Sequence, residues 1–171
     1  MNKIKKLSWL IALVFAISGC KKETGPQGPP GPMGNANVQS FTLTTSWWNY
    51  TGNILSQWWS IPEITQDIYD NGMVMAYRDV GYWEALPTSY TGSGGSTVTW
   101  AHYHDIGVFE IDISHNVSGA PADPGTEYFK LVIASSRFMA ENPDLDWHNY
   151  NEVNQRLKSL GIKEQLIKPI K

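Results

Sequence analysis

Residues 108–114 read VFEIDIS, and this strict alternation of apolar and polar side chains decides the fold class. Successive side chains of a β-strand point to opposite faces, so the apolar set faces a core while Glu110 and Asp112 face water. A second run, 127–134, is apolar at both sets of alternating positions, which is typical of a central strand buried on both faces. Together the two runs predict a protein built mainly of β-strands.

Five further short runs with β-type patterning are separated by turn residues. They cover 38–45, 54–61, 73–79, 82–86 and 97–103. Glycines in the turns, such as Gly81 and Gly107, can adopt the positive φ that a tight turn needs. About seven strands at regular short spacing favour an antiparallel β-sandwich.

Two segments change to a helical pattern. Residues 65–72 are expected to form one capped turn, with Thr65 as N-cap and Gly72 in a left-handed conformation after it. Residues 149–160 predict one amphipathic helix, because a capping-box-like pair begins it and its apolar side chains fall on one stripe. The predicted fold is therefore mainly β: one β-sandwich domain over 38–171, of about seven strands, with a single C-terminal helix packed at one edge or end.

The N-terminus has the parts of a secretory signal. A basic segment, 1–6, precedes an apolar run, 7–17, and the run ends in Ile-Ser-Gly-Cys at 17–20. Eleven apolar residues span only about half of a ~30 Å hydrocarbon core, so the run is too short for a transmembrane helix. The ending resembles the lipobox of bacterial lipoproteins, which implies that residues 1–19 are a signal peptide and that Cys20 is acylated.

Residues 20–37 read as an extended linker that begins at this cysteine. Glycine recurs at positions 25, 28, 31 and 34, and proline fills four of the six positions between them. The pattern is that of collagen, but so few triplets favour a single-chain polyproline II spacer over a triple helix. At ~3.1 Å per residue, the spacer could hold a domain at most about 50 Å from a bilayer.

The lipobox, the short Gly-Pro linker and the β-rich domain together resemble a group of small Gram-negative lipoproteins described as collagen-like. The likeness extends into the domain, where residues 61–72 read IPEITQDIYDNG. The resemblance implies a lipid anchor in the outer membrane through Cys20, on either face of that membrane. It implies no activity, because the activity of the group is unassigned.

Charge is distributed unevenly along the chain. Without residues 1–19 the net charge is −6; residues 38–148 carry three basic and thirteen acidic side chains, and 149–171 carry five basic and two acidic ones. No basic surplus is available to neutralise phosphates, so nucleic acid is excluded as a class of partner. We expect the basic tail to pack against its own acidic domain rather than against a membrane, because Glu152 and Glu164 interrupt its cations.

Two histidines, His102 and His104, are spaced to face the same side of a strand, as ligands of zinc or copper can be. No third ligand at a standard spacing accompanies them, so a surface pair beside a turn is the favoured interpretation. Glu110 and Asp112 also share a face, but paired carboxylates on the water side of a strand are ordinary. The sequence thus predicts no cofactor and no catalytic residue.

Tryptophan is abundant, with eight in the chain and two adjacent pairs, Trp47-Trp48 and Trp58-Trp59, near the ends of neighbouring predicted strands. Adjacent residues point to opposite faces of a strand, so at least one ring of each pair is expected outside the core. Exposed rings of this kind can bind sugars or partner proteins, although packing under loops is the favoured interpretation.

Three functions remain open at this point. The leading one is a membrane-anchored lipoprotein that presents a non-catalytic structural or interaction module, with a glycan or an envelope protein as its partner. The first alternative is a carbohydrate- or peptide-binding domain that uses the exposed tryptophans, and the second is a metal-dependent enzyme. Fold class alone does not choose among them.

Overall fold

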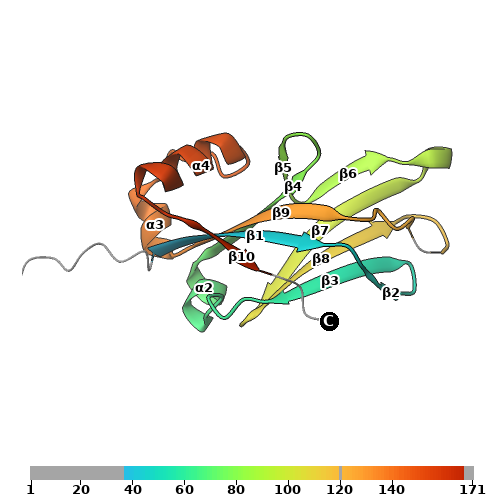
Figure 1. The fold of residues 1–171 in the computed structure, drawn as a ribbon, viewed down its shortest axis with the longest axis horizontal. Helices are drawn as coiled ribbons and strands as arrows, with labels where there is room; N and C mark the ends of the chain where they lie inside the picture. Colours follow the sequence, from blue (N-terminus) through green and yellow to red (C-terminus); the bar gives the residue numbers. More distant parts are fainter. Residues whose placement is uncertain (1–36, 120, 168–171) are drawn as a thin grey trace, which may run out of the picture. The chain divides into compact units, whose positions relative to one another are not determined.

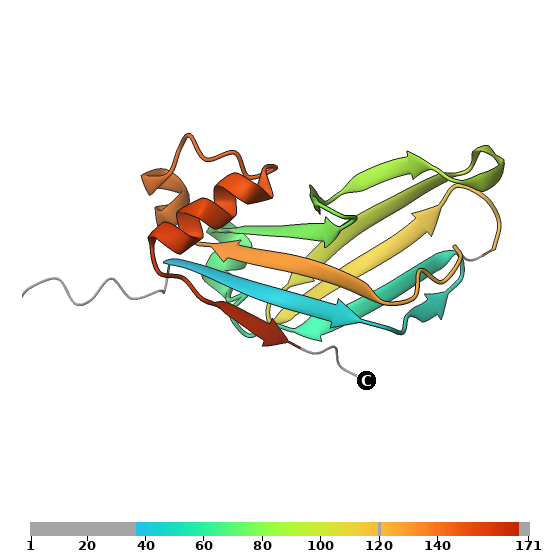
Figure 2. The same cartoon turned by 45° about the horizontal axis from the view of Figure 1, so that its top comes forward.

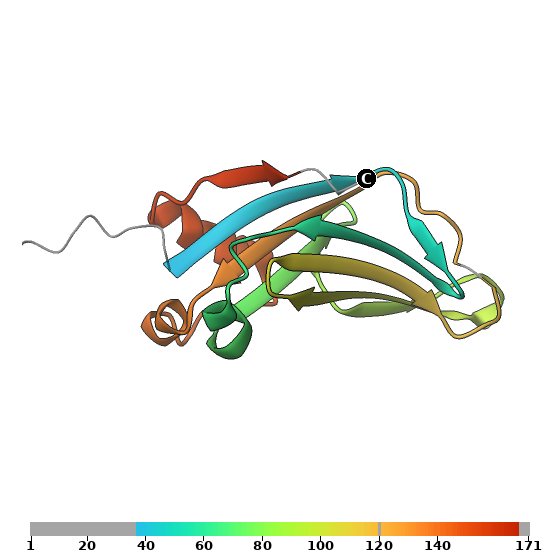
Figure 3. The same cartoon turned by 90° about the horizontal axis from the view of Figure 1, so that it is seen from below.

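The computed structural model describes residues 37–119 and 121–167, and in this part of the chain the protein is mainly β. Two five-stranded sheets face each other, as Figure 1 shows, and Figure 3 shows them as separate layers. The predicted signal peptide, Cys20 and the predicted linker up to residue 36 lie outside the described residues.

The described residues contain ten strands, three α-helices and one 3₁₀ helix. In chain order they are β1 (Val38–Thr45), β2 (Asn49–Thr51), β3 (Ile54–Ser60), α2 (Gln66–Asn71), β4 (Met73–Asp79), β5 (Trp83–Ala85), β6 (Thr88–Thr91), η3 (Ser93–Gly95), β7 (Thr97–Asp105), β8 (Val108–His115), β9 (Glu127–Ala134), α3 (Ser136–Glu141), α4 (Tyr150–Ser159) and β10 (Glu164–Ile167).

The first sheet has the strand order β10-β1-β9-β4-β5, and the second has the order β2-β3-β8-β7-β6. Every neighbouring pair is antiparallel except β1 and β10, which are parallel. The prediction of a mainly β fold with mostly antiparallel sheets is confirmed. The predicted number of strands was wrong, because β2, β6 and β10 are edge strands of three or four residues, too short to show an alternating pattern.

The main core lies between the two sheets. On β8 the side chains of Phe109, Ile111 and Ile113 are buried in it, as their alternation predicts. The largest fully buried side chains there are Trp59 of β3 and Trp100 of β7. The sandwich is therefore closed by aromatic packing from the second sheet against aliphatic and aromatic side chains of the first.

A second core lies on the outer face of the first sheet. Val132 of β9 packs there with Phe138 of α3 and with Val153 and Leu157 of α4. Figure 2 shows these helices gathered over the end of the sheet where β1 begins and β9 ends. Strand β9 is apolar on both faces because it contributes to both cores, which is the arrangement expected for a central strand.

The short helices differ in part from expectation. Thr65 caps α2 as predicted, since its hydroxyl accepts a hydrogen bond from the Ile68 amide. Gly72 is not left-handed: its φ is −91°, and glycine is required there because a Cβ would lie 2.8 Å from the carbonyl oxygens of Ile68 and Ala134. Helix α3, capped by Ser135, was not predicted.

Candidate functional site

The outer face of the second sheet is left open by the helices, which lie over the first sheet and at the end of the sandwich. On this face Trp58 of β3 and Tyr103 of β7 both pair with Glu110 of β8, so that the three side chains form one row across three strands. Trp58 is 39% exposed and Tyr103 is 57% exposed. Cross-strand neighbours have Cβ atoms about 5 Å apart, so Glu110 lies directly between two aromatic rings.

A second row lies beside the first. Asp112 of β8 pairs with Ser56 of β3 and with Ala101 of β7. Ser114 and Thr99 form the next pair along the same face. We name the surface formed by Trp58, Tyr103, Glu110, Asp112, Ser56, Thr99 and Ser114 the Trp58–Tyr103 face.

The two carboxyl groups of this face interact with each other. Burial, the charge of Glu110 and a hydrogen bond between the two carboxyl groups together raise the pKa of Asp112 to about 6, with burial as the largest cause. Oδ1 of Asp112 is shielded from solvent and has no hydrogen-bond partner among the described residues. The two carboxyl groups thus lie close together, and the strands that carry and flank them, β3, β7 and β8, contain no lysine or arginine.

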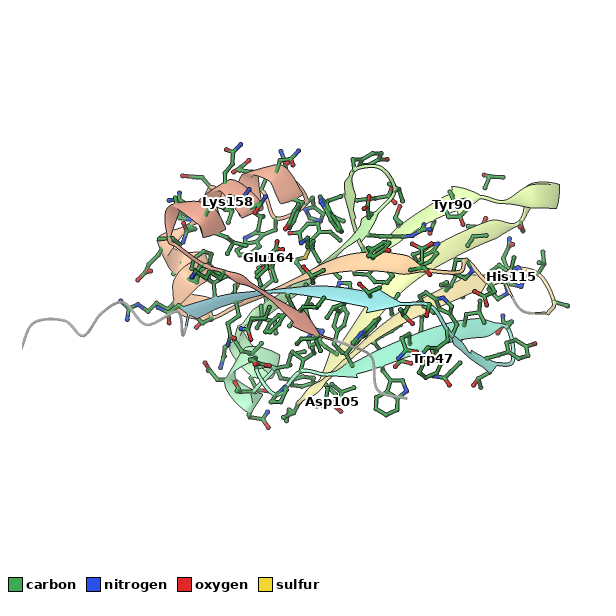
Figure 4. The ribbon with its side chains drawn as sticks, viewed as in Figure 1. Trp47, Tyr90, Asp105, His115, Lys158 and Glu164 are labelled. Carbon is green, nitrogen blue, oxygen red and sulfur yellow. The ribbon has the colours of Figure 1, made fainter. Side chains whose placement is uncertain are left out.

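Lysine and arginine are absent from all five strands of the second sheet, β2, β3, β8, β7 and β6. The described cations come from the first sheet, from its helices and from the segment that follows them: Arg78, Lys130, Arg137, Arg156, Lys158 and Lys163. Figure 4 shows Lys158 of α4 and Asp105 of β7 on opposite sides of the molecule.

Cations of the first sheet are paired within the domain. Arg78 makes two hydrogen bonds to Glu127, at 3.0 and 2.8 Å, and its guanidinium lies 3.6 Å from the ring centre of Trp100. Lys130 pairs with Glu164 of β10, the strand that packs on β1. The Lys130–Glu164 pair links the tail segment to the first sheet, whereas the Trp58–Tyr103 face belongs to the second.

The four predicted tryptophans do not form one exposed surface. Trp59 is fully buried, and only Trp58 of that pair is on the open face. Trp47 and Trp48 lie in the connection between β1 and β2 rather than on a strand. Trp48 packs on the core, 5.8 Å from Trp100 between ring centres, and its indole N–H donates to the carbonyl of Gly125 at 3.2 Å.

Tyr103 is the residue of this face that sequence reasoning missed. Its position opposite Glu110 and Trp58 depends on the register of β3, β8 and β7. The alternation of β7 alone puts Tyr103 on the side opposite the two histidines, and that signal was available in the sequence.

The rings of His102 and His104 lie on the same side of β7, with their centres 6.4 Å apart. They face inward: His102 stacks on Phe109, and His104 contacts Tyr69 of α2. Burial lowers the pKa of His102 to about 4, and the neighbouring His104 lowers it as well. In the part of the chain that the structure describes, no three His, Cys, Asp or Glu side chains lie close enough to share a metal ion.

A surface hollow of about 700 Å³ lies between the β4–β5 turn and the start of α4. Its carboxylates have local roles, since Asp79 accepts a hydrogen bond from the Gly81 amide and Asp146 accepts one from the His148 amide. Such bonds stabilise turns and need no ligand. No helix in residues 37–119 and 121–167 is long and apolar enough to cross a membrane.

Comparison of the chain with protein-family models, with curated proteins and with solved structures finds no match in any of the three. The site is therefore defined by its own geometry: two exposed aromatic rings in register on either side of an acidic pair.

Proposed function

We propose that the protein is a bacterial lipoprotein, anchored in the outer membrane through acylated Cys20, that presents its β-sandwich as a non-catalytic interaction module. The anchor rests on the N-terminal sequence, where a basic segment, an apolar run and Ile-Ser-Gly-Cys follow one another. Several acyl chains on one cysteine would hold the chain stably, since each buried methylene contributes about 0.8 kcal/mol.

The recognition surface of the module is the Trp58–Tyr103 face. The observation that carries this proposal is the in-register row of Trp58, Glu110 and Tyr103 on a sheet face that no described helix covers. Exposed aromatic side chains offer large contact areas at a low cost in side-chain entropy, and they are enriched in binding surfaces. The partner would be a glycan or a protein of the cell envelope.

Photo-crosslinking in a Gram-negative host tests the recognition surface. The full-length protein carries a benzophenone amino acid either at Ser56, on the Trp58–Tyr103 face, or at Tyr128, which is 49% exposed on the outer face of the first sheet. We expect adducts from Ser56 that disappear when Trp58→Ala and Tyr103→Ala are combined. Equal adducts from both positions would contradict the assignment of the surface.

The anchor is tested separately by metabolic labelling. We expect labelled palmitate in the wild-type chain and none in Cys20→Ala, which should also leave the membrane fraction. Label that persists in Cys20→Ala would show that the acyl chains lie elsewhere.

A further inference from the structure

The two exposed rings of the Trp58–Tyr103 face are separated by one strand. Two strand spacings put the β3 and β7 backbones about 10 Å apart at this row. A ligand that contacts both rings must therefore cross β8 roughly at right angles to the strands, passing over Glu110. A flat, extended chain of rings suits this path, because the apolar face of a sugar ring can stack on an aromatic side chain.

The polar groups around the rings favour a ligand rich in hydroxyl groups. Ser56, Thr99 and Ser114 surround Asp112 on the same face, and Thr99 lies 2.8 Å from the hydroxyl of Ser89 on β6. Hydroxyl and carboxylate oxygens can accept several hydrogen bonds from a polyol. An apolar ligand would leave these groups without partners, which is costly.

The negative charge of the face favours a ligand that carries positive charge. Glu110 and Asp112 lie on neighbouring rows, and no lysine or arginine is present on any strand of the second sheet. An anionic ligand would be repelled by this pair. A ligand ammonium group would make charge-assisted hydrogen bonds to it, and these are about twice as strong as neutral ones.

Resting on the proposed function, we infer that the Trp58–Tyr103 face binds a glycan that bears amino groups. Sugar rings of the glycan stack on Trp58 and Tyr103, and an ammonium group between them binds Glu110 and Asp112. The rings supply affinity that depends little on charge, and the acidic pair supplies the preference for amino sugars over their neutral counterparts.

Calorimetric titration of the full-length acylated protein in detergent micelles tests this inference at pH 6.5. The probes are β-linked hexamers of glucosamine and of N-acetylglucosamine, which share one backbone, an α-linked hexamer of galacturonic acid as the anionic glycan, and hexalysine as a cationic peptide. We expect the glucosamine hexamer to bind at least tenfold more tightly than the acetylated one, and the galacturonic acid hexamer to show no binding.

The variants separate stacking from charge. Trp58→Ala and Tyr103→Ala should each weaken binding of both glucosamine hexamers at least fivefold, whereas Trp58→Phe retains most of the affinity. Glu110→Gln should reduce the preference for glucosamine, and Glu110→Gln combined with Asp112→Asn should remove it, while both leave the binding of the acetylated hexamer unchanged. Tyr128→Ala and Asp144→Asn, an exposed ring and an exposed carboxylate away from the face, serve as matched controls. Thermal unfolding of each variant verifies that it is folded.

Three results would overturn the inference. They are equal binding of the glucosamine and acetylated hexamers, no binding of either, and tighter binding of hexalysine than of the glucosamine hexamer. If adducts from Ser56 persist in cells while no hexamer binds, the inference about amino sugars fails and the proposed interaction module stands. If the adducts from Ser56 are also absent, both fail.

Discussion

The two sheets of the sandwich differ in what lies on their outer faces. On the first sheet, Val132 is buried beneath Val153 and Leu157 of α4, so the outer face completes a second core. On the second sheet, Trp58 and Tyr103 remain exposed beside two carboxylates. The domain thus buries the outer face of one sheet in a second core and leaves Trp58 and Tyr103 exposed on the outer face of the other.

The largest expected effect separates two neighbours on β3. Trp59→Ala should lower the free energy of unfolding by about 3–5 kcal/mol, because the ring is fully buried between the sheets and its loss leaves a cavity. Trp58→Ala should cost less than about 1 kcal/mol, since its ring lies on the open face. Urea denaturation measures both. Similar losses would mean that Trp58 is structural and that the face is not free.

The covering helix gives the next largest effect. Leu157→Ala should cost about 3 kcal/mol, because this side chain is buried in the second core. The matched control is Leu160→Ala, whose side chain is 42% exposed and should change stability by less than about 0.5 kcal/mol. If the two variants were equally stable, α4 would not be contributing its apolar stripe to the sheet.

Protonation of His102, on the inner face of β7, should make the protein less stable in acid. Burial lowers the pKa of His102 to about 4 in the native state, against 6.5 for an ordinary histidine, so the unfolded chain binds the proton first. Stability that is present above pH 6.5 should therefore fall by roughly 3 kcal/mol as the pH decreases to 4. His102→Gln should make the curve of unfolding free energy against pH flatter over this range. An unchanged slope would place the titration on another group.

Protonation of Asp112, on the outer face of β8, should have a smaller effect of opposite sign: it should make the protein more stable in acid. Burial and Glu110 raise the pKa of Asp112 to about 6 in the native state, from 3.8, so the native state binds the proton first. The charged group that acts on it is Glu110, two residues away on its own strand; Tyr103 of β7 lies opposite Glu110, and β3 contributes no charge.

Above pH 6 the carboxylate of Asp112 therefore destabilises the native state. Asp112→Asn should raise stability by about 1 kcal/mol at pH 8, a value reduced for solvent screening, and this gain should shrink as the pH decreases from 6 to 4. Thermal unfolding at a series of pH values measures the change. A gain that is constant with pH would indicate a change in packing rather than in charge.

The difference between the two sheets could be predicted in part from single strands. The alternation in 108–114 correctly gives β8 one buried face, and the continuous apolar pattern in 127–134 gives β9 two. Period and burial are local properties, because each side chain's direction follows from its position on the strand. The same reasoning places Trp58 and Trp59 on opposite faces.

The candidate site itself depends on register between strands far apart in the chain. Trp58, Tyr103 and Glu110 meet only because β3 and β7 flank β8 with these residues in line. Hydrophobic patterning fixes which face a side chain takes, but it does not fix which partner lies opposite. The edge strands β2, β6 and β10 were missed for a related reason, since their pairing rather than their own pattern makes them strands.

The parallel pairing of β10 with β1 has a mechanical consequence. Strand β1 is held along its length by β9 on one side and over Ser40–Leu43 by β10 on the other. A pull on Val38 that is directed along the axis of β1 would load these hydrogen bonds in shear, so many of them would have to break at once. A tether attached before β1 would therefore apply its force to a strand that is hydrogen-bonded on both sides, and this strand should resist mechanical unfolding.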